Sequence, residues 1–269
     1  TVLAVIAASG PTWQRLPAPA FRNASALVIA LDLTGSMDAQ DIAPTRLERT
    51  KMALIQLVEG LSENRIGLII FAKNALLRTP LTYDTYTLKS HIQQLATWQM
   101  KDQGSDLINP LVLAQNKFAE LASQSHTARV VFLFTDGEHF GSSTPDQLRF
   151  YPKNKIHTFF IGVGTPEGGT IKMAGKSKVD SNGNPVVTKR NDLFLREISN
   201  YTKSNLNYLS TTNPGDLVFQ LIESTQSIQS GSIDLRKILI ANDKYYYFLL
   251  LGLILLSLDI IITIQNVKL

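Results

Sequence analysis

The sequence predicts an α/β fold with a doubly wound, mostly parallel sheet, and three observations support this prediction. Short apolar runs of strand length alternate with longer stretches whose apolar residues recur at helical spacing. Some of the runs are apolar at nearly every position, as in residues 65–72, which is typical of strands covered on both faces. The 269 residues leave room for one sizeable domain and a small additional segment.

The predicted elements alternate along the chain, and this order favours right-handed crossover connections. The predicted strands are residues 26–31, 65–72, 75–81, 129–134, 156–163 and 206–209. The predicted helices are residues 47–61, 85–95, 107–121, 192–201 and 215–228. We interpret residues 75–81 as an edge strand that closes at Pro80, because proline cannot donate a hydrogen bond inside a sheet.

Residues 165–189 interrupt this alternation. Two extended runs with polar flanks surround Asp180–Asn184, which contains the dipeptide Asn182-Gly183. Asn-Gly is a strong signal for a tight hairpin turn, because both residues tolerate positive φ angles. The segment is therefore predicted to be a surface β-hairpin, inserted before the helix at 192–201.

Residues 245–264 form a nearly continuous apolar run that only Asp259 interrupts. Twenty helical residues span roughly 30 Å, the thickness of the hydrocarbon core of a bilayer, so the run predicts a C-terminal transmembrane helix. Residues 229–244 are then a polar linker between this helix and a domain at 21–228. The apolar start of residues 1–20 is interpreted as the end of an upstream membrane helix, which makes this segment membrane-proximal.

Composition excludes several classes of function. The chain has no cysteine, which rules out disulfides, zinc–thiolate sites and thiol nucleophiles. The net charge is +4, but the lysines and arginines are scattered and no dense basic run occurs. We therefore expect no nucleic acid among its partners.

Side chains that bear oxygen follow two of the predicted strands. Asp32, Thr34 and Ser36 come directly after residues 26–31, at a spacing of two that lets all three reach one point. Asp136 follows the strand at 129–134. In an open parallel sheet, ligands bind beyond the carboxyl ends of the strands. Hard oxygens of this kind suit Mg²⁺, or alternatively Mn²⁺ or Ca²⁺, so the sequence predicts a divalent metal site.

This pattern resembles the metal-ion-dependent adhesion site of the von Willebrand factor A (VWA) domain, which is Asp-x-Ser-x-Ser with a distant Thr and a distant Asp. Asp32, Thr34 and Ser36 match the first element, with Thr in place of the first Ser, and Asp136 matches the distant Asp. The resemblance implies that Ser105 takes the place of the distant Thr. It also implies a Rossmann-like domain that binds a metal and, through it, an acidic residue of a protein partner.

Further features resemble the Bat, or aerotolerance, group of bacterial membrane VWA proteins. They are the segments Arg46–Glu48 and Pro80–Thr82, the insertion and the apolar C-terminal run. This resemblance implies a place in the bacterial inner membrane, with other membrane proteins of the same system and a MoxR-type AAA+ ATPase as partners. It favours a periplasmic domain, whereas the basic residues at 236, 237 and 244 beside the apolar run favour a cytoplasmic one, so both sides stay open.

A second hypothesis belongs to another class. A strand that ends in Asp also occurs in phosphotransferases of the haloacid dehalogenase type, where the Asp is the nucleophile. Those enzymes use a second Asp two residues later, and here Thr34 takes that position. We therefore expect a binding protein without catalytic activity, and the alternative is a magnesium-dependent phosphotransferase with Asp32 as nucleophile. His139 is interpreted as a solvated loop residue rather than a ligand, because the other candidate ligands are all oxygens.

Overall fold

The computed structural model describes residues 12–17, 25–102, 104–120, 128–148, 155–173, 176–209, 214–232 and 239–243. The chain divides into two compact units, one from Asn23 to Ile233 and the other from the segments on either side of it. No helix within these described ranges is long and apolar enough to cross a bilayer. Residues 245–264, for which a transmembrane helix is predicted, lie outside them, as do residues 1–11 and 18–20 of the membrane-proximal segment.

The larger unit is built on a six-stranded sheet with the strand order β11-β6-β5-β2-β3-β4. These strands are β2 (Ala26–Asp32), β3 (Arg65–Phe71), β4 (Ala75–Thr82), β5 (Arg129–Thr135), β6 (Ile156–Gly162) and β11 (Asn205–Tyr208). Every neighbouring pair is parallel except β3 and β4, which confirms the predicted mostly parallel sheet. The edge strand β4 runs through the exposed Pro80 to Thr82 instead of closing there, because an edge position needs no donor on its open side.

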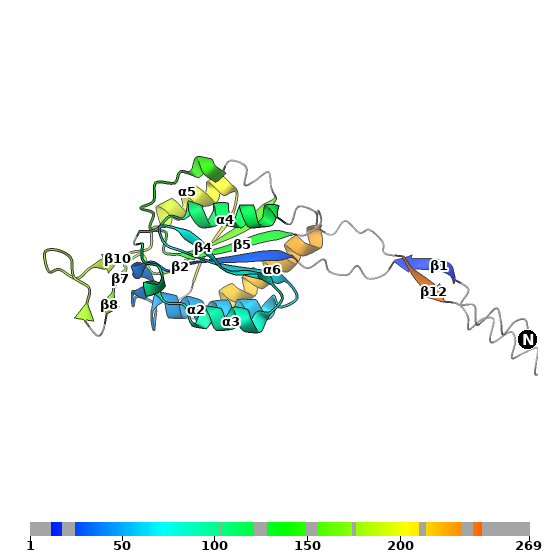
Figure 1. Ribbon diagram of the computed structural model, residues 1–269, viewed down its shortest axis with the longest axis horizontal. Coiled ribbons are helices and arrows are strands. Elements are labelled where there is room, and N and C mark those ends of the chain that lie inside the picture. Colours follow the sequence, from blue (N-terminus) through cyan, green and yellow to red (C-terminus); the bar gives the residue numbers. More distant parts are fainter. Residues whose placement is uncertain are drawn as a thin grey trace, which may run out of the picture. The chain divides into compact units, whose positions relative to one another are not determined.

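Helices cover both faces of this sheet, as Figure 1 shows. The described helices of this unit are α2 (Arg46–Gly60), α3 (Thr85–Gln93), α4 (Ile108–Ala119), α5 (Asp192–Thr202) and α6 (Pro214–Ser232). Alternate residues of β2 enter two separate cores: Ile29 packs with residues of α2, α3 and α6, and Val28 packs with residues of α4 and α5. Burial on both faces explains why β2 reads as an unbroken apolar run.

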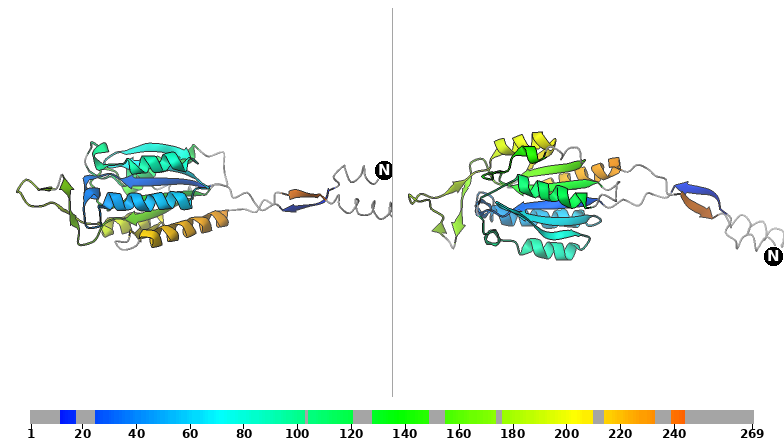
Figure 2. Two further views of the ribbon diagram at one scale, coloured as in Figure 1. Left: turned by 90° about the horizontal axis from the view of Figure 1, so that it is seen from below. Right: turned by 45° about the horizontal axis from the view of Figure 1, so that its top comes forward.

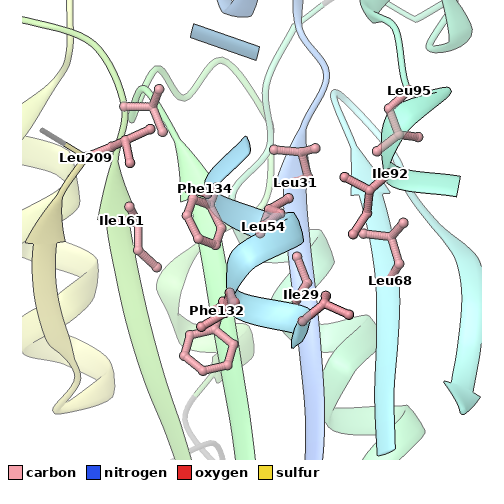
Figure 3. Close-up of a cluster of buried hydrophobic side chains, with 14 of the residues drawn as sticks. Ile29, Leu31, Leu54, Leu68, Ile92, Leu95, Phe132, Phe134, Ile161 and Leu209 are labelled. Carbon is pink, nitrogen blue, oxygen red and sulfur yellow. The ribbon is translucent and has the colours of Figure 1, made fainter. Parts of the chain in front are cut away.

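The core beneath α2, α3 and α6 is drawn in Figure 3, where Phe132 and Phe134 of β5 lie beside Ile29 and Leu31 of β2. Phe132 also stacks on Phe159 of β6, with ring centroids 5.5 Å apart. Such an aromatic pair contributes about 0.5–1.5 kcal/mol beyond the area that it buries. This packing fixes the two central strands whose ends carry the predicted metal ligands.

The chain changes direction across the sheet at β2. From β2 it passes through α2 to β3 on one side, and it later returns to β5 on the other side. A point of this kind opens a crevice at the carboxyl ends of the two diverging strands. The strands that meet there end in Asp32 and Thr135.

The insertion at 165–189 forms two successive hairpins where the sequence predicts one. β7 (Gly169–Thr170) pairs with β10 (Val187–Thr188), and β8 (Lys172–Met173) pairs with β9 (Lys176–Ser177). The β7–β10 pair encloses the β8–β9 hairpin and a second hairpin after it, which is closed by an antiparallel bridge between Val179 and Pro185. The predicted turn lies in this second hairpin, where the Asp180 carboxylate accepts the N–H groups of Asn182 and Asn184. Figure 2 shows this segment beyond one end of the sheet. An antiparallel bridge between Ile171 and Ala39 joins it to the loop after β2.

The smaller unit contains an antiparallel ribbon of β1 (Thr12–Pro17) and β12 (Leu239–Asp243). The predicted linker at 229–244 is therefore structured at both ends, since α6 continues to Ser232 and β12 occupies residues 239–243. Local sequence patterns do not reveal this ribbon, because each strand is short and its partner lies at the other end of the chain.

Candidate metal centre

Asp32, at the end of β2, is completely buried. One carboxylate oxygen, Oδ1, accepts the backbone N–H of Thr34 at 2.9 Å. The other, Oδ2, accepts the hydroxyl of Thr135 at 2.7 Å and that of Ser105 at 3.3 Å. The donors come from the loop after β2, from β5 and from the loop before α4, so three distant segments meet at this carboxylate.

The two predicted hydroxyl ligands after β2 lie side by side. The Oγ1 atom of Thr34 and the Oγ atom of Ser36 are 2.8 Å apart, and each residue is only 7% exposed. Ser105, also buried, reaches the Asp32 carboxylate from a loop that is fixed where the N–H of Asp106 donates to the carbonyl of Ala72. The structure therefore brings together the three hydroxyls and the Asp32 carboxylate.

Asp136 completes the predicted set, and it is also completely buried. Its Oδ1 accepts the N–H of Glu138 at 3.2 Å, and a side-chain hydrogen bond joins it to Ser36. Its Oδ2 accepts Nη1 of Arg46 at 3.0 Å, and the side chains of both partners are 0% exposed. One of the two predicted acidic ligands is thus already paired with a cation of the protein itself.

Arg46 is a central residue of the site whose place there the sequence does not predict. Its Nε and Nη2 atoms donate to the two carboxylate oxygens of Asp41, each at 2.8 Å. Nη2 also donates to the carbonyl of Thr188 in β10, at 3.1 Å. A polar residue at the start of a helix normally faces solvent, and the partners at 41, 136 and 188 are too far apart in sequence to suggest otherwise.

The electrostatics reflect the burial of several carboxylates in one place. Burial, and then the charge of Asp136, raise the pKa of Asp32 to about 7. Burial also raises the pKa of Asp136, against the opposing effects of the Ser36 hydrogen bond and of Arg46. For Asp41 burial acts in the same upward direction, but the hydrogen bonds from Arg46 and Thr165 outweigh it and lower its pKa.

The donor set fits a hard divalent cation. Two carboxylates and three hydroxyls supply only oxygen atoms, which Mg²⁺, Mn²⁺ and Ca²⁺ prefer. In the part of the chain that is described, no group of three or more His, Cys, Asp and Glu side chains has the arrangement of a metal site. A metal beside Asp32 would therefore depend on the hydroxyls as well as on the acidic residues.

An open cleft lies over these side chains. It has a volume of about 330 Å³. Its lining combines the hydroxyl-bearing loops, the segment after β5 and the insertion, and consists of Thr34, Gly35, Ser36, Gly104, Ser105, Glu138, Phe140, Ile171, Lys178, Val186, Val187 and Thr188.

Two further residues after β5, His139 and Glu138, lie close to the site, and His139 differs from its sequence-based interpretation. His139 is not a solvated loop residue: its ring stacks on Phe194 with centroids 4.5 Å apart, and its Nδ1 accepts the N–H of Leu107 at 3.3 Å. Glu138 lines the cleft, and its carboxylate accepts the hydroxyl of Thr188 at 2.9 Å. Burial, and then Asp136, raise the pKa of Glu138.

Comparison with known proteins agrees with this architecture. Residues 27–139 match the family model of the von Willebrand factor type A domain. The crystal structure of the conserved hypothetical protein BatB from Bacteroides thetaiotaomicron is similar, with a TM-score of 0.70 and 27% identity over 77% of this chain and 99% of that one. An aerotolerance-related membrane protein from Bacteroides fragilis NCTC 9343 gives a TM-score of 0.67 and 28% identity, over 74% of this chain and 99% of that one.

Curated relatives include a "UPF0353 protein" from Nocardia farcinica (strain IFM 10152), which is 30% identical over 141 residues. That match covers 51% of this chain and 41% of the relative, and a match in Mycobacterium sp. (strain KMS) covers 62% and 52%. The chain thus spans about half the length of the curated relatives it matches. Together, the comparisons show a match to the VWA family model over residues 27–139 and a mostly parallel α/β fold similar to that of Bat-type proteins.

Proposed function

We propose that this chain is a membrane-anchored binding module without catalytic activity, which holds Mg²⁺ and, through it, binds an acidic residue of a protein partner. The observation that carries the proposal is the convergence of five buried oxygen-bearing side chains below an open cleft. They are Asp32, Thr34, Ser36, Ser105 and Asp136. Mn²⁺ or Ca²⁺ would suit the same oxygens.

The charge balance explains why a partner would be needed. Asp32 and Asp136 are the acidic residues of the set, and Arg46 already offsets part of the charge of Asp136. A divalent ion held there by two carboxylates and neutral hydroxyls is under-neutralised. A carboxylate that enters the cleft would therefore gain strong attraction in a site that is partly shielded from water.

The membrane setting is part of the same proposal. Residues 245–264 would anchor the module in a bacterial inner membrane, with the domain on the periplasmic or the cytoplasmic side. The similar protein from Bacteroides fragilis is itself described as an aerotolerance-related membrane protein. Other membrane proteins of the same system and a MoxR-type AAA+ ATPase are the proposed partners.

The alternative, a phosphotransferase with Asp32 as nucleophile, has less support from the geometry. Both oxygens of Asp32 accept hydrogen bonds from groups fixed by the fold, and the residue has no exposed surface. The acid/base position of such enzymes is Thr34 here. Trapping of a phosphoryl mimic such as beryllofluoride on Asp32 would favour the enzyme.

Calorimetric titration of the full chain with Mg²⁺ tests the metal site. Asp32→Ala should weaken binding most, because it removes a charge and the group on which three segments meet, and Ser36→Ala should weaken it less. Ser62→Ala, which changes an exposed serine, is the matched control and should bind like the wild type. Equal affinity of wild type and Asp32→Ala would overturn the assignment of the metal.

Cross-linking in membranes tests the role of the metal in partner binding. Partners should be captured by the wild type in Mg²⁺, and both a chelator and Ser36→Ala should reduce their capture, while Ser62→Ala should not. If the captured set is the same in all four conditions, recognition does not pass through the metal.

A further inference from the structure

The cleft over the candidate metal centre has two walls of different origin. One wall is made by the hydroxyl-bearing loops, with Thr34, Ser36 and Ser105. The facing residues come from the insertion and include Lys178 and Val187. A metal and one carboxylate would engage only the first wall, so the second wall is available for the neighbours of that carboxylate.

The second wall is held in place rather than loosely attached. The carbonyl of Thr188, at its base, accepts Nη2 of Arg46, and its hydroxyl accepts Nη1 at 3.3 Å. The carboxylate of Asp41 accepts the N–H of Thr165 at 2.7 Å, at the start of the insertion. A preorganised wall costs less entropy to bind against than a mobile one.

Apolar side chains at the cleft are exposed although their backbones are fixed. Phe140 is 74% exposed, and its N–H donates to the carbonyl of Ser105 at 2.8 Å. Val187 is 52% exposed and is paired with Thr170 in the β7–β10 ladder. Rigid apolar groups of this kind gain free energy when an apolar side chain covers them and displaces water.

Charge on the two sides of the cleft is unequal. Lys178 is exposed at the cleft, and among the residues that the structure describes no acidic side chain forms an ion pair with it. The insertion contains four lysines against two acidic residues, Glu167 and Asp180. Glu138, by contrast, lines the cleft with a carboxylate bound to Thr188. A second acidic group is therefore attracted near Lys178 and repelled near Glu138.

We infer that the insertion, together with Phe140 of the segment after β5, selects the partner's sequence on either side of its metal-bound acidic residue. The occupant is an extended peptide segment of a partner protein, in which an apolar residue packs on Phe140 and Val187 and a second acidic residue pairs with Lys178. The volume of about 330 Å³ is near the lower end of the range for ligand clefts, which suits a few side chains of such a segment. This inference rests on the proposed function, since the metal supplies the first contact.

Selection from a display library of short random peptides tests the inference, with the full chain in detergent as bait. In Mg²⁺, the wild type should enrich peptides with an acidic residue beside an apolar residue and a second acidic residue. Phe140→Ser should abolish the apolar preference, and Lys178→Gln should abolish the preference for the second acidic residue. Phe219→Ser, which changes an exposed phenylalanine outside the cleft lining, is the matched control and should keep both. The best peptide should bind about tenfold less tightly to either cleft variant, a difference of about 1.4 kcal/mol.

The outcomes separate this inference from the proposed function. If acidic residues are enriched in Mg²⁺ without any preference for their neighbours, or if the preferences survive both cleft substitutions, the inference fails and the metal-dependent function stands. If Mg²⁺ and chelator yield the same peptides, the metal-dependent function fails, and the inference fails with it. Calorimetry should show unchanged Mg²⁺ affinity in both cleft variants.

Discussion

At the scale of single residues, the main feature is a group of buried carboxylates that share one internal cation. Burial raises the pKa of both Asp32 and Asp136, and the charge of Asp136 raises that of Asp32 further. Arg46 joins Asp136 to Asp41. The free energy of unfolding therefore depends on the protonation state of Asp32 and on the presence of Arg46.

The pKa of Asp32 predicts how stability depends on pH when metal is removed. A carboxyl group whose pKa is higher in the folded than in the unfolded chain binds its proton more tightly when folded. This group therefore makes the free energy of unfolding fall as pH rises from about 4 to about 7. Thermal unfolding in chelator should show the fall in the wild type, and Asp32→Asn should reduce it, while the raised pKa values of Asp136 and Glu138 sustain the remainder.

Asp180→Asn is the control for this experiment. Its carboxylate is exposed, and hydrogen bonds from the turn lower its pKa, so its contribution changes only at lower pH. The decline should persist in this variant. A wild type whose stability does not fall over the range would contradict the account of Asp32.

Replacing Arg46 tests how much its ion pairs with Asp41 and Asp136 stabilise the fold. Arg46→Met leaves Asp41 and Asp136 without their common partner, and loss of one member of a buried ion pair costs about 3–5 kcal/mol. Lys89→Met breaks the exposed pair with Glu59 and should cost about 0–1 kcal/mol. Urea unfolding measures both values, and similar losses in the two variants would show that the Arg46 network does not stabilise the fold.

At the scale of secondary-structure elements, the important contact is between the start of α2 and the insertion. Arg46 is the first residue of α2, and it bonds to Thr188 of β10. Gly164, just before the insertion, has a φ angle of +105°, and an added Cβ atom would lie 2.7 Å from Cζ of Arg46. The backbone at this point approaches the guanidinium closely because glycine has no side chain.

Gly164→Ala should therefore cost more than the strain of a positive φ angle alone. Gly183 has a φ angle of +82°, and no atom lies within 4 Å of a Cβ added there, so Gly183→Ala reports that strain by itself. Chemical unfolding should show the larger loss for Gly164→Ala, together with weaker Mg²⁺ binding because Arg46 must move. Equal losses would mean that Arg46 adapts without cost.

The elements also show where sequence reasoning succeeds and where it stops. Strands such as β2 and β5 are recognisable because burial on both faces leaves nearly continuous apolar runs. The closeness of Asp32, Thr34, Ser36 and Asp136 follows from parallel strands that end at one edge, whereas Ser105 is expected there only from the resemblance to the VWA metal site. The Arg46 network and the β1–β12 ribbon do not follow, because each depends on contacts between residues far apart in the chain.

At the scale of the whole molecule, the open prediction is the attachment to a membrane. Residues 245–264 are long and apolar enough for a bilayer span, so the full chain should remain with membranes after a carbonate wash. A truncation at Gly231 should be released into the supernatant, provided that the upstream membrane helix is also absent, and fractionation with immunoblotting would detect the release. A full chain that washes off would show that this segment is not a membrane anchor.

The paired base of the insertion has a consequence for how the molecule can diversify. The chain enters the insertion through β7 and leaves it through β10, and these two strands are hydrogen-bonded neighbours. Residues 171–186 can therefore be exchanged or lengthened while their ends stay together, and each doubling of such a loop costs only about 0.6 kcal/mol. A chimaera that receives another segment between Thr170 and Val187 should therefore keep its sheet and bind a different partner protein. This stretch can change in sequence and length while the rest of the fold stays the same.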